Sequence, residues 1–139
     1  MSIERTLTII KPDAVARGHI GDIIRIFEAN QFKIIAARFM HLTKKEAEGF
    51  YAVHRARGFF ESLTTFMSSG PALAMVLEGD NAIFRLREVM GATDPAKAAD
   101  GSIRKLYAES IERNCVHGSD APETARFEIG YFFAGVDLA

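Results

Sequence analysis

Apolar residues change their spacing several times along this chain, and each change predicts a new element. Alternating apolar positions predict a strand over residues 3–11, with Leu7 and Ile9 on one face. Pro12 ends this strand, because proline cannot donate to a strand ladder. Apolar residues at helical spacing follow at Ile20, Ile23, Ile24 and Phe27. Residues 32–42, rich in β-branched and aromatic side chains, predict a second strand.

The next segment has the pattern of a helical hairpin. Thr43 and Glu46 form a capping box, in which each side chain bonds the backbone N–H of the other residue. The helix that they open carries its apolar stripe at Ala47, Phe50, Tyr51 and His54. After a break at Gly58, a second short helix presents Phe60, Leu63 and Met67.

The second half of the chain predicts two more strands and two more helices. The unbroken apolar run at residues 72–77 is typical of a central strand buried on both faces. Asp80 or Asn81 caps a helix that turns Ile83, Leu86 and Met90 inward. The pattern then weakens, which indicates a long loop from residue 91 to about 113. A short strand containing His117 follows, and Asp120 with Glu123 predicts the cap of a last helix.

This order predicts an α/β (α+β) fold of the ferredoxin-like βαββαβ type, with an inserted helical hairpin and a long loop before the last strand. We expect helices on one face of an antiparallel sheet. Helical or subunit contacts would cover the other face.

Composition narrows the classes of protein. The 139 residues predict a single domain over 1–139, and 48% hydrophobic with 25% charged residues is ordinary globular composition. A net charge of −1 argues against non-specific binding to nucleic acid or anionic membranes. Cys115 is the only cysteine, the N-terminus carries charge, and no apolar run approaches the roughly 20 residues of a membrane span. We therefore expect a cytoplasmic protein.

His117 is the most informative single residue. It stands between a short apolar stretch and a Gly-Ser-Asp turn, where an imidazole is both fixed and reachable. Imidazole is nucleophilic at neutral pH, and a carboxylate such as Glu128 could fix its tautomer. A straight helix would separate the two residues by roughly 10–15 Å, so the fold must return the chain. A merely structural histidine remains the alternative.

Other residues are candidates for binding a phosphorylated ligand. Lys11 stands at a strand end, where a lysine can be held close to a phosphate as a point charge. Planar guanidinium groups suit phosphate oxygens, and they are available at Arg57, Arg87 and Arg104. Thr93 could bond a phosphate or form a local turn. Because Phe60 is assigned to the core, its neighbour Phe59 is a candidate exposed surface for stacking a base. For each of these residues a solvated or structural role remains open.

Together these residues resemble the nucleoside diphosphate kinase family along the whole chain. The resemblance is carried by Thr8-Ile9-Ile10-Lys11-Pro12-Asp13-Ala14, Ser69-Gly70-Pro71, Leu77-Glu78-Gly79, Gly91-Ala92-Thr93-Asp94-Pro95, Gly101-Ser102-Ile103-Arg104, Asn114-Cys115-Val116-His117-Gly118-Ser119-Asp120 and Glu128. Each stretch is weak alone, but their order and spacing together are highly specific.

The resemblance implies a ping-pong transfer of the γ-phosphoryl group from a nucleoside triphosphate, usually ATP, to a nucleoside diphosphate. It implies that His117 carries the phosphoryl group, that Glu128 hydrogen-bonds its ring, and that Mg²⁺ arrives on the nucleotide phosphates rather than on protein ligands. The remaining matched positions would bind nucleotide or support the site: Lys11, Arg57, Arg87, Arg104 and Thr93 at the phosphates; Phe59 and Ile111 at the base; Lys11 and Asn114 at the ribose; Tyr51, Ser119 and His54 around them. Relatives assemble from dimers into tetramers or hexamers, so a homo-oligomer is expected.

The chain departs from the family pattern at three places, one of which is Ala121, where a serine is common after the Gly-Ser-Asp. Gly58 stands where proline is common, which predicts a looser turn around Arg57 and Phe59. Lys105-Leu106-Tyr107 replaces a common Gly-Asp-Phe and bears on loop packing and subunit contacts.

Three other classes fit the residues less well. An RNA-binding module would need the glycine-aromatic signature, and a hydrolase using Ser119 would need a Gly-x-Ser-x-Gly elbow; neither is present. A scaffold without activity would be expected to lose the histidine or the arginines.

Overall fold

A four-stranded antiparallel sheet organises the computed structural model, which describes residues 2–138. The strands are β1 (Ile3–Ile10), β2 (Lys33–Met40), β3 (Ala72–Asp80) and β4 (Val116–Gly118). Their order across the sheet is β2-β3-β1-β4, and all neighbouring pairs are antiparallel. The predicted ferredoxin-like arrangement is therefore confirmed.

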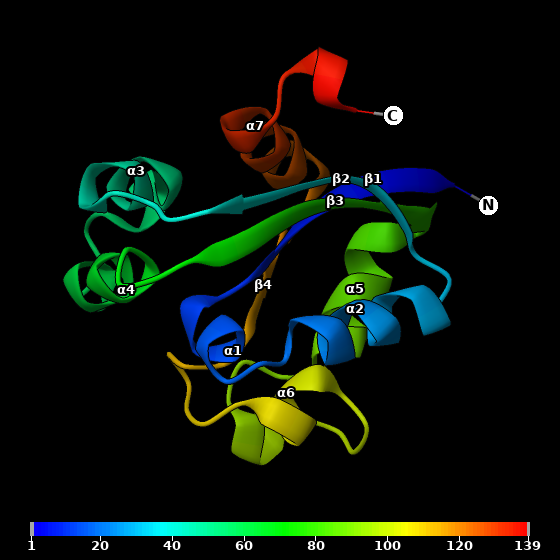
Figure 1. Cartoon of the computed structure of the whole chain (residues 1–139), viewed down its shortest axis with the longest axis horizontal. Coiled ribbons are helices and arrows are strands. Elements are labelled where there is room, and N and C mark those ends of the chain that lie inside the picture. The colour runs from blue at the N-terminus through cyan, green and yellow to red at the C-terminus, as the bar shows by residue number, and fades with distance from the viewer. Residues whose placement is uncertain (1, 139) are drawn as a thin grey trace.

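Helices cover both faces of this sheet (Figure 1). The helices are α1 (Pro12–Ala16), α2 (Ile20–Ala29), α3 (Lys44–Phe50), α4 (Phe60–Met67), α5 (Ala82–Met90), α6 (Ile103–Tyr107) and α7 (Pro122–Phe132). One core packs α3, α4 and α7 on the sheet, and the other packs α1, α2, α5 and α6. Of the two alternatives for the second face, helices from the same chain therefore supply the cover. No helix within residues 2–138 has the length and apolar character needed to cross a lipid bilayer.

The central strands explain the two cores, because successive side chains of a strand point to opposite faces. In β3, Ala74 and Val76 belong to the α3–α4–α7 side, whereas Met75 and Leu77 belong to the other. The unbroken apolar run that predicted burial on both faces is thereby confirmed.

The predicted helix caps are only partly right. Thr43 Oγ1 accepts from Glu46 N at 3.1 Å, and Glu46 Oε1 accepts from Thr43 N at 2.8 Å, so this capping box is confirmed. Asn81 does precede α5, but its side chain does not cap it. Instead Glu4, from β1, accepts the N–H of Ile83 at 3.2 Å.

The cap predicted for α7 is wrong. Ala121 occupies the N-cap position of this helix, and no side chain in the described part of the chain caps it. Asp120 precedes the N-cap position, so it is too early in the chain to serve as the cap residue. Pro122 does lie in the first turn of the helix.

Several short helical segments were not predicted. The stretch expected as a long loop contains a 3-10 turn at Pro95–Lys97 and the helix α6. Pro12 ends β1 as predicted, but it also starts α1. Elements of three to five residues are too short for an apolar repeat to show. Further 3-10 turns lie at Ala52–His54 and Gly135–Asp137.

Gly91, at the end of α5, is where the fold depends most on the absence of a side chain. Its φ is +90°, and an added Cβ would lie 2.8 Å from Ser102 Cβ. We expect Gly91→Ala to lower the free energy of unfolding by about 2–4 kcal/mol, through backbone strain plus overpacking. Urea unfolding measures this. Gly101→Ala is the matched control, because Gly101 has φ +84° but open space around it. A Gly91→Ala variant no less stable than Gly101→Ala would contradict the overpacking argument.

Candidate active site

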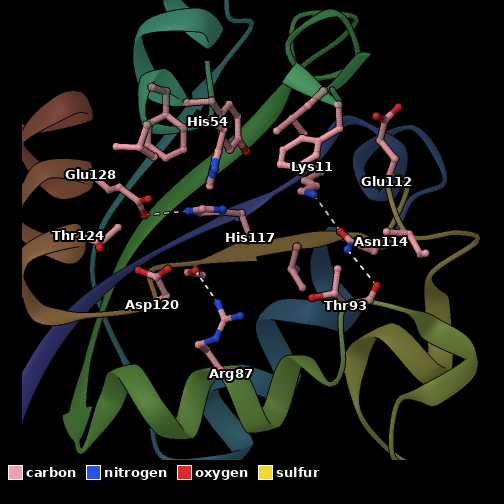
Figure 2. Close-up of a pocket in the computed structure, with 18 of the residues that line it drawn as sticks. Lys11, His54, Arg87, Thr93, Glu112, Asn114, His117, Asp120, Thr124 and Glu128 are labelled. Atoms are coloured by element: carbon pink, nitrogen blue, oxygen red, sulfur yellow. Dashed lines mark hydrogen bonds and ion pairs between the residues drawn. The ribbon is translucent and has the colours of Figure 1, made fainter. Parts of the chain in front are cut away.

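One cavity of about 800 Å³ opens between α3, α4, α7 and the segment that leads into β4. It is lined by Lys11, Phe50, Tyr51, Val53, His54, Phe59, Leu63, Arg87, Thr93, Arg104, Ile111, Glu112, Asn114, Val116, His117, Gly118, Asp120, Glu123, Thr124, Phe127 and Glu128. Its volume falls within the range of small-molecule sites. Figure 2 shows His117 near its centre, with Glu128 on one side and Lys11, Asn114 and Thr93 on the other.

The backbone of His117 is fixed by the sheet. His117 is the middle residue of β4 and pairs with Ile9 of β1. Thr8, fully buried on the neighbouring strand, donates its hydroxyl hydrogen to the His117 carbonyl at 2.8 Å. The imidazole therefore projects from a rigid support into the cavity.

A carboxylate fixes the ring of His117. Nε2 lies 2.8 Å from Glu128 Oε1, on α7 (Figure 2). Because an ionised carboxylate can only accept, the neutral ring carries its hydrogen on Nε2. Nδ1 then keeps a free lone pair.

Ser119 in turn holds the Glu128 carboxylate in place. It is fully buried, donates to Glu128 Oε1 at 2.7 Å and accepts from Leu7 N at 3.4 Å. It therefore holds Glu128 rather than lining the cavity. The prediction that the fold returns the chain to bring Glu128 to His117 is confirmed.

Two aromatic rings confine the imidazole. Phe50 and Tyr51 meet it edge-on, with ring centroids 5.3 Å and 5.9 Å away. The hydroxyl of Tyr51 is buried and has no hydrogen-bond partner among residues 2–138. Burial, together with the charge of Glu128, raises the pKa of this phenol, so it remains a neutral donor.

A chain of hydrogen bonds orders the opposite wall. Lys11 Nζ donates to Asn114 Oδ1 at 2.9 Å, and Asn114 Nδ2 donates to the Thr93 carbonyl at 3.2 Å (Figure 2). Lys11 is only 6% exposed, and burial, followed by the charge of Arg104, lowers its pKa to about 8.

An unusual backbone conformation at Cys115 holds this wall together. Its φ is +74°, a region that residues with a side chain rarely adopt. Asp13 Oδ2 accepts its N–H at 3.1 Å, and its carbonyl accepts from Lys11 N at 2.8 Å. These bonds tie Asn114 and Lys11, about a hundred residues apart, into one unit.

Two arginines hydrogen-bond the backbone on either side of His117. Arg87, on α5, donates to the Gly118 carbonyl at 3.1 Å. Arg104, on α6 and 5% exposed, donates to the carbonyls of Gly91, Val116 and Asn114 at 3.0, 2.8 and 3.3 Å. Burial, followed by the nearby charge of Arg87, lowers the pKa of Arg104 to about 10. A bound anion would relieve this crowding of positive charge.

The outer part of the cavity is apolar. Phe59 and Ile111 remain 47% and 59% exposed although both line the cavity. Phe60 is buried, as the argument about adjacent aromatic residues predicted. His54 lies beside Phe59, with 5.6 Å between ring centroids. Exposed aromatic and aliphatic side chains at a cavity mouth suit a flat ring system.

Arg57 is the one predicted nucleotide-binding residue that does not line the cavity. It is exposed. It lies in the turn next to Gly58, between the 3-10 turn at Ala52–His54 and α4. Sequence reasoning also missed lining residues on α7 (Glu123, Thr124 and Phe127), Asp120 just before it, and Glu112. Two of the α7 residues carry a detectable signal, because Phe127 and Thr124 lie one and four residues from Glu128 on the same helix.

An imidazole with a free ring nitrogen, three cationic side chains and an apolar mouth define a site for a phosphorylated compound with a ring. Comparisons with known proteins agree. The family model for nucleoside diphosphate kinase matches residues 4–138. The curated nucleoside diphosphate kinase of Desulfosudis oleivorans is 61% identical over 136 residues, covering 98% of both chains. That of Nitratidesulfovibrio vulgaris is 60% identical with the same coverage.

Solved structures agree as well. The nucleoside diphosphate kinase of Aquifex aeolicus matches with a TM-score of 0.97 and 44% identity, over 99% of this chain and 100% of its own. A halophilic nucleoside diphosphate kinase from Halobacterium salinarum, solved in complex with CDP, matches with a TM-score of 0.94 and 40% identity, over 99% of this chain and 92% of its own. The chain belongs to the nucleoside diphosphate kinase family. It is a phosphotransferase that binds nucleotides and needs a divalent cation.

Proposed function

We propose that His117 carries the γ-phosphoryl group between nucleotides in a ping-pong reaction. The observation that supports this most strongly is the hydrogen bond from Nε2 to Glu128, which leaves Nδ1 as the nucleophilic nitrogen in a cavity rich in positive charge. Glu128 and Ser119 act by holding the ring, and Glu128 also stabilises the positive charge that develops on it.

Each half-reaction exchanges one bond for another. The Nδ1 lone pair forms a bond to the γ-phosphorus, and the bond from that phosphorus to the β,γ-bridging oxygen breaks with its electron pair remaining on the diphosphate. The proton on Nε2 stays hydrogen-bonded to Glu128 throughout. The second half-reaction reverses these steps with a different diphosphate.

The phosphates would bind at the inner part of the cavity, where the cationic side chains lie. We assign Lys11, Arg87, Arg104 and Thr93 to the β- and γ-phosphates, because phosphoryl transfer depends chiefly on positioning and charge stabilisation. The Tyr51 hydroxyl, which has no hydrogen-bond partner within residues 2–138, can donate to the transferred group. These donors match phosphate oxygens rather than a metal ion, so Mg²⁺ would enter as part of the nucleotide complex.

The nucleoside would occupy the outer part. The base stacks between Phe59 and Ile111 beside His54, and the ribose hydroxyls meet Lys11 and Asn114. Arg57 lies outside the lining, and we propose that it reaches the phosphates only when the turn at Gly58 moves toward bound nucleotide.

Labelling tests the proposal. Brief incubation with Mg²⁺ and γ-³²P-labelled ATP should leave up to one alkali-stable, acid-labile phosphate per chain, and the addition of GDP should discharge it as labelled GTP. Initial rates at several fixed ATP concentrations should give parallel double-reciprocal plots against GDP. Intersecting plots together with unlabelled enzyme would contradict a phosphoenzyme route.

The lowered pKa of Lys11 predicts how nucleotide binding depends on pH. The free enzyme loses the Lys11 charge as pH rises through about 8, whereas a bound phosphate favours the charged form. ADP affinity should therefore fall above pH 8, and ADP binding at pH 8.5 should take up protons. Calorimetry in two buffers of different ionisation enthalpy measures the uptake. The variant Lys11→Met should lose it, and equal uptake by both proteins would contradict the assignment.

We further propose that the enzyme is a cytoplasmic homo-oligomer built from dimers. The free, buried Cys115 fits a reducing compartment. Phe39 on the edge strand β2 and Leu106 on α6 are 60% and 53% exposed, and contacts with a second copy of the chain would bury them. Sedimentation equilibrium would distinguish tetramer, hexamer and monomer.

A further inference from the structure

Glu112 brings a negative charge into a cavity that otherwise suits an anion. It lines the cavity next to Ile111, and it has no lysine, arginine or histidine within ion-pair distance among residues 2–138. Its charge also favours the protonated form of Lys11. Figure 2 shows it on the same side of the cavity as Lys11 and Asn114, away from Glu128.

A hydrogen bond across the chain fixes its carboxylate. Ser62 Oγ, on α4, lies 2.8 Å and 3.0 Å from the two carboxylate oxygens of Glu112. Helix α4 begins directly after Phe59, and Leu63 follows Ser62 within it. The bond between Ser62 and Glu112 therefore joins α4 to the segment before β4, and both segments border the outer part of the cavity. Arg113 reinforces the same junction, because its guanidinium lies 5.0 Å from the ring centre of Phe66.

The Glu112 carboxylate can accept further hydrogen bonds besides the one from Ser62. A hydroxyl group donates one hydrogen, whereas an ionised carboxylate can accept about four hydrogen bonds. Glu112 is half-buried, so its free lone pairs are accessible to a ligand in the cavity.

The bases differ in what they offer to such a group. Guanine presents two adjacent donors, N1–H and the 2-amino group, which match the two oxygens of a carboxylate. Adenine and cytosine place an acceptor nitrogen beside their amino group. Uracil places a single N–H between two carbonyl oxygens. Guanine is thus the base that a carboxylate prefers.

We propose that Glu112, positioned by Ser62, is a specificity-determining residue that favours guanine nucleotides over adenine nucleotides. The inference rests on the proposed placement of the base between Phe59 and Ile111. Stacking there accepts every base, and Glu112 adds a preference on top of it. Hydrogen bonds to a charged group predict that the unmodified enzyme binds GDP about tenfold more tightly than ADP. IDP, which lacks the 2-amino group, should bind with intermediate affinity.

Isothermal titration with GDP, IDP and ADP in the presence of Mg²⁺ tests this on the full chain. Glu112→Gln should bind GDP and ADP with affinities within about a factor of two, because an amide supplies only one acceptor oxygen. Ser62→Ala keeps the charge but frees the side chain, so it should retain a reduced preference. Glu123→Gln is the matched control, because it removes the same charge from another part of the lining. Its GDP-to-ADP ratio should equal that of the unmodified enzyme.

Equal binding of GDP and ADP by the unmodified enzyme, or an unchanged ratio in Glu112→Gln, would overturn the proposal. Diphosphate binding requires no phosphoryl transfer, so this outcome is distinguishable from failure of the His117 mechanism. Conversely, an enzyme that is never labelled by ATP but discriminates GDP from ADP through Glu112 would contradict only the mechanism.

Discussion

Replacing His117 with alanine is expected to lower kcat/KM for transfer from ATP to GDP by at least about 10⁴-fold, because the side chain that forms the covalent bond is lost. The remaining cavity still holds the cationic side chains, so nucleotide binding should change far less than transfer. A steady-state assay of GTP formation measures the first quantity, and titration with ADP measures the second.

His41→Ala provides the matched control for this experiment. His41 lies outside the cavity lining and bonds the Ser68 carbonyl at 2.9 Å. Its loss should leave transfer unchanged within about twofold, as expected for a surface substitution. If His117→Ala retained transfer near that of His41→Ala, another residue would have to carry the phosphoryl group.

Replacing Arg104 with alanine has the second largest expected effect. Its guanidinium is already ordered by three backbone carbonyls, so it can stabilise negative charge on the phosphates with no further reorganisation. We expect kcat/KM to fall by about 10²–10³-fold. Saturating ADP should also raise the midpoint of thermal unfolding less than it does in the unmodified enzyme, because the ADP affinity is lower.

Arg104→Lys separates charge from geometry. Lysine keeps a positive charge but cannot reproduce the planar fork that reaches the three carbonyls. We expect it to recover at most a small part of the lost activity. Full recovery by lysine would mean that charge alone matters and that the fixed orientation of Arg104 contributes nothing.

The sheet could be predicted because its strands have recognisable patterns of apolar residues in their own local sequence. Alternation in β1 and the apolar run in β3 follow from the faces that these strands bury, and such patterns need no knowledge of the rest of the chain. The short helices α1 and α6 escaped prediction because five residues make less than two helical turns. The cap of α5 was not predicted because Glu4, which supplies it, lies in another element.

For the site, the sequence indicated which residues have suitable chemistry, but it did not indicate which of them lie close together. The spacing of His117 and Glu128 predicted a wide separation along a straight helix, and only the packing of α7 on the sheet brings the carboxylate to the ring. Residue type likewise favoured Arg57 as strongly as Arg104. The difference between them is burial: Arg104 is enclosed by backbone carbonyls, whereas Arg57 stands on an exposed turn. Glu112 gave no signal at all, because its partner Ser62 is 50 residues away.

The most direct test of the mechanism is to identify the atom that bears the phosphoryl group. Phosphorus NMR of the enzyme after brief exposure to Mg²⁺ and ATP, combined with peptide mapping, distinguishes the two ring nitrogens and locates the residue. The hydrogen bond between Nε2 and Glu128 predicts one resonance from phosphorus bonded to Nδ1 of His117. Phosphorus on Nε2, or on any residue other than His117, would contradict the account.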